Sequence, residues 1–222
     1  ALSEVMLEEN TSGEVAGSEA AARRLSLIRN SASEALKCIN DLLSSAASSV
    51  HGPLDMQVIA IEPVVKRIAR SFADQAQSKE QHLTYEGLAE PARVEGDADR
   101  LREAVSNLVS NAVKYAPLGS TIELRTAATP TDVRIAVSDE GPGLSPREQE
   151  KLFEPFERLS PEPTGGEESS GLGLYITKQI TQRHGGSVTV DSAEGEGSTF
   201  TIVLPRVTRE DNGQHVTPDH VT

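Results

Sequence analysis

Apolar residues recur at helical spacing in the first quarter of the chain. From about Ser18 to Val50 the apolar positions lie alternately three and four residues apart, which is the spacing of a heptad repeat. The seam consists of Leu25, Ile28, Ala32, Ala35, Ile39, Leu42 and Ala46, and it is widened by Leu36 and Leu43. Residues 1–9 indicate the end of a preceding helix. The pattern predicts a helical hairpin or coiled-coil segment and leaves open an intramolecular hairpin or a dimeric four-helix bundle.

A different pattern begins after His51-Gly-Pro53, where glycine and proline end the long helix. Strands are predicted where apolar and polar residues alternate, at 54–58, 83–85, 121–126, 133–139, 187–190 and 199–204. Helices are predicted at 61–79, 97–115 and 171–184, and residues 144–170 are a polar loop. This order predicts an α/β fold, a two-layer sandwich of a mixed β-sheet with helices on one face. The polar residues 207–222 are predicted to be a disordered tail.

Composition narrows the class of protein. The chain has 222 residues, 36% of them apolar, and only 3% aromatic with no tryptophan, so we expect one mainly aliphatic core. The 34 acidic residues against 21 basic ones argue against nucleic-acid binding, which needs basic clusters. The single cysteine, Cys38, excludes an intramolecular disulfide and a C-x-x-C metal site.

Location is predicted from three further features. The sequence has no run of about 18 apolar residues and no signal peptide, so we expect a cytoplasmic protein. The chain begins at Ala rather than Met, and we expect it to be a fragment of something longer. A membrane-anchored parent is therefore left open, with the membrane reached only through a segment outside this chain.

Polar residues share one face of the helix predicted at 97–115. At about 100° per residue, four of them fall within about 80° of one another: Glu103, Asn107, Asn111 and Lys114. Apolar residues occupy the opposite side. Paired asparagines are unusual inside a helix, because the Asn side chain competes for backbone hydrogen bonds. Taken alone, however, the stripe is better explained as a solvated face.

Three short motifs follow this helix. The first, D-E-G-P-G at 139–143, comes after an alternating strand, and its glycines allow a tight turn. The second, F-E-P-F at 153–156, places two aromatic residues in a polar loop. The third, G-L-G-L at 171–174, opens a helix whose first amides are suited to phosphate, and no G-K-[ST] follows as in a Walker loop. Each alone has an ordinary explanation, namely a turn, a small apolar cluster and a hinge.

In this order and spacing, the four blocks resemble the catalytic ATP-binding domain of sensor histidine kinases, within the GHKL ATPase superfamily. The resemblance implies a Bergerat-type ATP-binding fold that takes ATP and Mg²⁺. It implies that Asn111 is a Mg²⁺ ligand and that Asn107 and Lys114 support the phosphates or the metal shell. Tyr115 would line the nucleotide, and Glu103 would polarise a water or a nucleophile.

The resemblance also assigns the remaining nucleotide contacts. Asp139 would accept a hydrogen bond from the exocyclic amine of adenine. Residues 159–170 would form a flexible ATP lid, anchored by the F-E-P-F block, which contacts the helical domain in the family. Ser169 stands where these kinases often carry a further glycine. Backbone approach and phosphate contacts would come from Gly141, Gly143, Arg158, Gly171, Leu172, Gly173 and Leu174.

The phosphoacceptor histidine of such kinases has no counterpart here. That histidine is followed by an acidic residue and, a few residues on, by a proline, and none of the five histidines has this context. His51 precedes Gly-Pro at a helix end, and His184 is predicted to be a helix C-terminal residue favoured by the dipole. We therefore interpret 1–52 as a partial helical dimerisation and phosphoacceptor domain without its acceptor, and 53–206 as the catalytic ATP-binding domain.

The resemblance implies a protein-histidine kinase. The γ-phosphoryl group of ATP would pass to a histidine absent from this fragment and then to an aspartate of a response-regulator receiver domain. The chain would form a homodimer through its N-terminal helices, bind MgATP, and not phosphorylate itself. Two alternatives remain: a non-catalytic nucleotide-binding dimerisation module, and a GHKL ATPase or Ser/Thr-directed kinase. The F-E-P-F block argues against the second, because such relatives generally lack it.

Overall fold

The computed structural model describes residues 52–157, 163–164 and 171–207. The predicted heptad seam, the helix end at 1–9, the tail from 208 onward and most of the predicted lid lie outside these residues. The chain divides into two compact units, and all described residues except Gly52 belong to the second, Pro53–Thr222. The account below concerns this unit.

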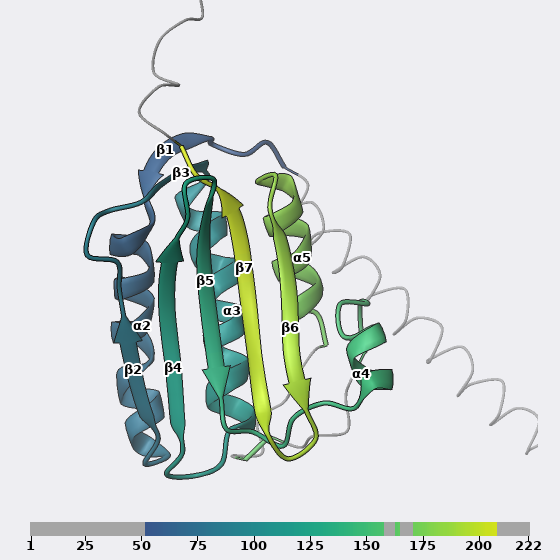
Figure 1. Cartoon of the computed structure of the whole chain (residues 1–222). Coiled ribbons are helices and arrows are strands. Elements are labelled where there is room, and N and C mark those ends of the chain that lie inside the picture. The colour runs from purple at the N-terminus through teal and green to yellow at the C-terminus, as the bar shows by residue number, and fades with distance from the viewer. Residues whose placement is uncertain (1–51, 158–162, 165–170, 208–222) are drawn as a thin grey trace, which may run out of the picture. The chain divides into compact units, whose positions relative to one another are not determined.

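A mixed sheet of five strands is the centre of the described part of the chain, in the order β2-β4-β5-β7-β6 (Figure 1). The strands are β2 (His82–Glu86), β4 (Thr121–Ala128), β5 (Asp132–Asp139), β6 (Ser187–Ala193) and β7 (Gly197–Pro205). Strand β2 pairs in parallel with β4, whereas the other neighbours are antiparallel. The prediction of a mixed sheet is confirmed.

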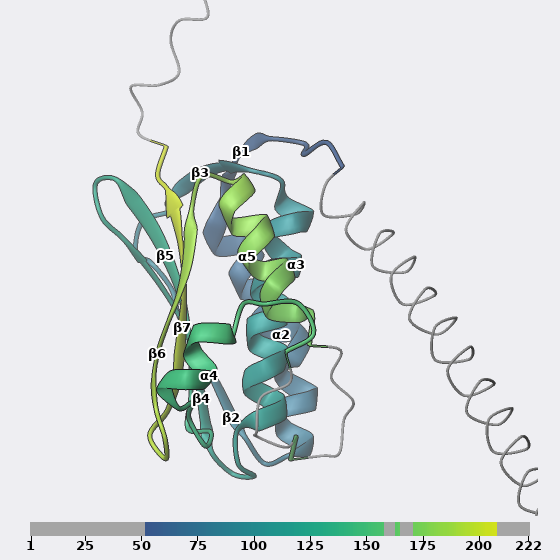
Figure 2. The same cartoon turned by 90° about the vertical axis from the view of Figure 1, so that its right-hand side faces the viewer.

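Helices cover one face of this sheet, which gives the two layers seen from the side in Figure 2. They are α2 (Ile61–Ser78), α3 (Ala98–Tyr115) and α5 (Gly173–Arg183), and the short α4 (Pro146–Lys151) lies beyond β5 in the chain. Within the described residues, Phe200 is the single aromatic side chain of the buried core, so the predicted aliphatic core is confirmed. The largest fully buried side chains are Ile61, Val65, Ile68, Leu101, Leu108, Ile122, Leu124, Ile135, Ile180, Ile202 and Leu204.

The first turn of α3 is held by Asp97. Its carboxylate accepts hydrogen bonds from the backbone N–H groups of Asp99 (3.0 Å) and Arg100 (3.2 Å), and from that of Asp55 (3.2 Å). Burial favours the neutral acid, but the three backbone hydrogen bonds and the charge of Arg100 together lower the pKa of Asp97. An ionised aspartate at a helix start is stabilising, so α3 begins where its acidic N-terminus predicts.

His184 ends α5, as predicted. Its ring is buried, which the sequence did not predict. Its Nδ1 lies 2.7 Å from the Ile180 carbonyl oxygen, and its Nε2 accepts the Asp97 backbone N–H at 3.0 Å. The ring therefore joins the end of α5 to the start of α3, and Nε2 carries no proton in this arrangement.

Three elements at the margins were predicted wrongly or not at all. The strand predicted at 54–58 is β1 (Gln57–Ala60), because pairing with β3 (Arg93–Gly96) begins only at Gln57 opposite Gly96. Strand β3 has four residues and was missed. Helix α4 was missed within the polar loop, although Ser145 and Glu148 form a capping box around Pro146.

Candidate nucleotide-binding site

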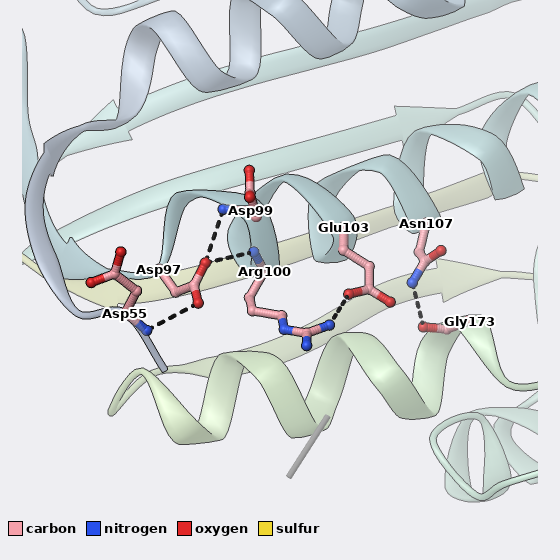
Figure 3. A network of polar contacts seen from close by, with 7 residues as sticks. All are labelled: Asp55, Asp97, Asp99, Arg100, Glu103, Asn107 and Gly173. Atoms are coloured by element: carbon pink, nitrogen blue, oxygen red, sulfur yellow. Dashed lines mark hydrogen bonds and ion pairs between the residues drawn. The ribbon is translucent and has the colours of Figure 1, made fainter. Parts of the chain in front are cut away.

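The polar stripe of α3 lies where its periodicity predicts. The side chains of Glu103, Asn107, Asn111 and Lys114 are all half-buried, whereas the residues of the opposite face are fully buried against the sheet. Asn107 Nδ2 donates a hydrogen bond to the Gly173 carbonyl oxygen at 3.3 Å (Figure 3). The stripe therefore meets the start of α5, which is 66 residues away in the chain.

Helix α5 begins at Gly173 without a side-chain cap. The N–H groups of a helix's first turn have no partner inside the helix and, together with the helix dipole, favour an anion. Thr177, which sequence reasoning missed, fixes this end: its hydroxyl donates to the carbonyl oxygens of Gly173 (2.9 Å) and Ala104 (3.3 Å). The sequence signal that could have identified Thr177 is its position one helical turn after Gly173.

Gly173 has room for a larger residue in the unliganded chain. A Cβ placed there would meet only Asn107, at 3.7 Å or more, which is ordinary van der Waals contact. We predict that Gly173→Ala folds normally and gains up to about 1 kcal/mol of unfolding free energy, because alanine favours a helix. If α5 binds phosphate through close backbone approach, the same change weakens MgATP binding about 10-fold, equivalent to about 1.4 kcal/mol. Thermal unfolding and calorimetric titration measure the two effects, and unchanged affinity would contradict a phosphate site at Gly173.

Asp139 lies at the end of β5, half-buried beside Gly141. One carboxylate oxygen, Oδ1, accepts the Gly141 backbone N–H at 2.8 Å. Burial raises the pKa of Asp139 to about 6, and the Gly141 hydrogen bond opposes this shift. A Cβ on Gly141 would lie 2.5 Å from Oδ1, so glycine is needed for this carboxylate geometry. Within the described residues the second oxygen, Oδ2, makes no hydrogen bond, so it retains its capacity to accept one.

The loop after Asp139 is fixed on the β6–β7 hairpin. Gly143 has φ +68°, and a Cβ there would lie 1.8 Å from the Ala193 carbonyl oxygen. The Leu144 N–H donates to Ser192 Oγ at 3.0 Å, and the Gly195 N–H donates to the Pro142 carbonyl oxygen at 2.7 Å. Glycine at position 143 is therefore required for packing against the hairpin, and its approach to a ligand stays a prediction.

The F-E-P-F block is split between the core and the surface. Phe153 packs against the core, with Lys178 Nζ 5.9 Å from its ring centroid. Phe156 is 46% exposed and has φ +68°, an unusual backbone conformation for a non-glycine residue. Its N–H donates to the carbonyl oxygen of Gly171 at 3.0 Å, which ties the block to the start of the G-L-G-L run.

The C-terminal end of α3 lies beside the Asp139 turn. The Tyr115 carbonyl oxygen is 3.4 Å from the position of a Cβ on Gly141. The Lys114 carbonyl oxygen accepts the N–H and hydroxyl of Thr164, both at 2.9 Å. The structure therefore brings Asn107 to Gly173 and Tyr115 to Gly141, whereas the described contact of Lys114 is with Thr164 in the predicted lid. Arg158 lies outside the described residues.

Comparison with known proteins finds an ATPase family and several sensor histidine kinases to which this chain is similar. The family described as "Histidine kinase-, DNA gyrase B-, and HSP90-like ATPase" matches residues 96–208. The sensor-like histidine kinase SenX3 of Mycobacterium tuberculosis is 43% identical over 116 residues, which cover 51% of this chain and 28% of that protein. The sensor histidine kinase WalK of Bacillus subtilis is 32% identical over 204 residues, 90% of this chain and 33% of that protein.

Solved structures agree with these relatives. A mycobacterial sensor histidine kinase, MprB, has a TM-score of 0.58 and 29% identity, covering 68% of this chain and 97% of that chain. Full-length ShkA in complex with AMPPNP has a TM-score of 0.61 and 28% identity, covering 70% of this chain and 32% of that chain.

The mixed sheet, the helices on one face and the α3–α5 site define a two-layer α/β ATPase domain. The chain belongs to the family of histidine kinase-, DNA gyrase B- and HSP90-like ATPases. Its relatives within that family are sensor histidine kinases, and the chain spans about a third or less of the length of SenX3 and WalK. No helix among the residues that the model describes is long and apolar enough to cross a membrane.

Proposed function

We propose that this chain is the ATP-binding catalytic portion of a two-component sensor histidine kinase. It binds ATP with Mg²⁺ and transfers the γ-phosphoryl group to a histidine, from which an aspartate of a response-regulator receiver domain takes it. Residues 53–206 form the catalytic domain in this proposal. Residues 1–52 are part of the helical dimerisation and phosphoacceptor domain, and the protein acts in the cytoplasm as a homodimer.

The main support for this proposal is that two candidate ligand contacts, the start of α5 and the Asp139 turn, lie beside different turns of α3. Gly173 adjoins Asn107, whereas the Asp139 turn adjoins Tyr115. These two positions on α3 are eight residues apart, or about 12 Å at 1.5 Å per residue. An extended adenine nucleotide bridges such a separation, with its amine on the Asp139 carboxylate and its phosphates at the start of α5. Sensor kinases among the relatives support the kinase over another ATPase.

The residues present fit a magnesium ion that arrives with the nucleotide. Asn111 lies on the stripe between the two contacts, and a neutral amide oxygen suits a hard cation already bound to phosphate oxygens. Among the described residues, no group of three or more His, Cys, Asp or Glu side chains forms a metal site by itself. Bound there, Mg²⁺ would neutralise phosphate charge, while Asn107 and Lys114 would orient the phosphates.

Phosphoryl transfer to a separate acceptor tests the proposed function. We predict that the chain alone incorporates no label from γ-labelled ATP, and that adding a helical domain bearing the acceptor histidine of a similar sensor kinase gives an acid-labile phosphohistidine on that domain. A variant of the added domain without this histidine is the matched control. Absence of labelling by a chain that binds MgATP would favour a non-catalytic nucleotide-binding module. Rapid ATP hydrolysis or labelled Ser and Thr would favour a GHKL ATPase or a Ser/Thr-directed kinase.

A further inference from the structure

We propose that Arg100 is a positioning residue for the Glu103 carboxylate, which acts as the base toward the attacking nucleophile. This inference rests on the proposed function. Arg100 precedes Glu103 by three residues and lies in the same 80° sector of α3 as Glu103 and Asn107. Arg100 therefore extends the polar stripe by about one helical turn beyond Glu103, toward the N-terminus of α3.

The two side chains form a defined contact. Arg100 Nη1 donates to Glu103 Oε2 at 3.1 Å, and the side chains are 29% and 36% exposed, respectively (Figure 3). The backbone of Arg100 is itself fixed, because its N–H donates to Asp97 Oδ1 at 3.2 Å. Within the described residues, Glu103 Oε1 makes no hydrogen bond. The guanidinium therefore holds one oxygen of the carboxylate and leaves the other toward the site.

A second ion pair on α3 has the same spacing in the sequence and differs from the Arg100–Glu103 pair in its exposure to solvent. Arg102 Nη1 lies 2.9 Å from Asp99 Oδ1, again three residues apart, but these side chains are 47% and 78% exposed. Exposed pairs of this kind contribute little to stability. The Arg100–Glu103 pair is better shielded and lies one turn before Asn107, whose amide contacts Gly173 at the phosphate end of the site. A carboxylate near a triphosphate is repelled by it, and the Arg100 contact offsets this repulsion.

The chemical step is simplest with water as the nucleophile. The water oxygen forms a bond to the γ-phosphorus, and the bond from that phosphorus to the bridging β–γ oxygen breaks. The electron pair leaves with ADP, and the water proton passes to Glu103 Oε1. A positioned carboxylate typically accelerates such a step by 10²- to 10⁴-fold. Arg100 contributes by fixing the direction of Oε1, and it touches neither the nucleotide nor the water.

Single-turnover phosphate release and MgATP calorimetry on the full chain test this role. We expect Glu103→Gln to slow release by about 10²-fold and Arg100→Gln by about 10-fold, with the MgATP Kd within about 2-fold of wild type. Arg100→Lys should restore part of the rate, because a single ammonium can reach Oε2 but holds it less rigidly. Arg102→Gln, the matched control with the exposed pair, should leave both quantities unchanged.

The double variant separates positioning from a structural role. If Arg100 acts through Glu103, Arg100→Gln in the Glu103→Gln background slows release no further. Additive losses, or an Arg100→Gln variant that loses affinity while keeping its rate, would overturn the inference. So would a wild-type chain that binds MgATP and releases no phosphate. Failure of the wild-type chain to bind MgATP at all would instead contradict the proposed function itself.

Discussion

Replacing Asp139 with Asn is expected to weaken MgATP binding by about 10²- to 10³-fold, equivalent to about 3–4 kcal/mol. The carboxylate has two acceptor oxygens, and the Gly141 N–H occupies Oδ1. An asparagine provides one acceptor only, so if its oxygen takes the Gly141 N–H, its amide N–H₂ faces the adenine amine as a second donor. Calorimetric titration measures the loss. Asp132→Asn, at the opposite end of β5, is the matched control and should bind normally.

The same change should stabilise the unliganded protein at neutral pH. Burial raises the pKa of Asp139 to about 6, above its value near 4 in the unfolded chain. A raised pKa means that this group's favourable contribution is complete below about pH 4 and is lost as the pH rises through about 6. At pH 7 the buried charge therefore costs stability, of order 1–2 kcal/mol once partial exposure is considered. The neutral Asn avoids this cost.

Thermal unfolding at two pH values tests whether Asp139→Asn raises or lowers the stability of the unliganded protein. We expect Asp139→Asn to unfold at a higher temperature than wild type at pH 7.5, and the difference to shrink at pH 4.5. Binding of ATP by the wild-type chain should weaken as the pH falls below about 6, because protonated Asp139 becomes a poorer acceptor. A variant that is less stable than wild type at pH 7.5 would contradict the conclusion that the buried Asp139 carboxylate costs stability at this pH.

Replacing Asn111 with Ala should weaken MgATP binding by about 10- to 100-fold, equivalent to about 1.4–2.8 kcal/mol. The proposed reason is loss of one oxygen ligand from the metal, so the loss should largely disappear when magnesium is chelated. The helix should remain intact, since Ala favours a helix interior more than Asn does. Ser106→Ala, on α3 but outside the sector of the stripe, is the matched control. An equal loss of affinity with and without magnesium would refute the metal assignment.

Long helices and strands could be predicted from the sequence because the repeat of apolar residues within each segment indicates its secondary structure. The apolar positions of α3 repeat over five turns, and β5 and β7 alternate over eight and nine residues. Strand β3 has only four residues and forms by pairing with β1. This pairing joins segments that are distant in the chain, so the residues around β3 do not indicate it. Helix α4 was hidden by its polar surroundings, although its capping box was visible at Ser145 and Glu148.

The candidate site was predictable where its members share one helix or one turn. The stripe of α3 follows from helical geometry, and Asp139 with Gly141 from adjacency in the chain. Contacts between distant segments were not predictable in this way. The Asn107 contact with Gly173 depends on how α3 packs against α5, and so does the hydrogen bond from Asp97 to His184. The place of His184 at the end of α5 was therefore predictable, but its burial was not.

A titration of the wild-type chain with MgATP and, separately, with MgGTP is the most direct measurement of the central claim. Guanine carries a carbonyl oxygen where adenine carries its exocyclic amine, so the Asp139 carboxylate should reject it. The account predicts saturable micromolar to sub-millimolar binding of MgATP at pH 7.5 and at least about 100-fold weaker binding of MgGTP. A folded chain that binds neither nucleotide, or binds both equally, would contradict an adenine nucleotide site between α3, Asp139 and the start of α5.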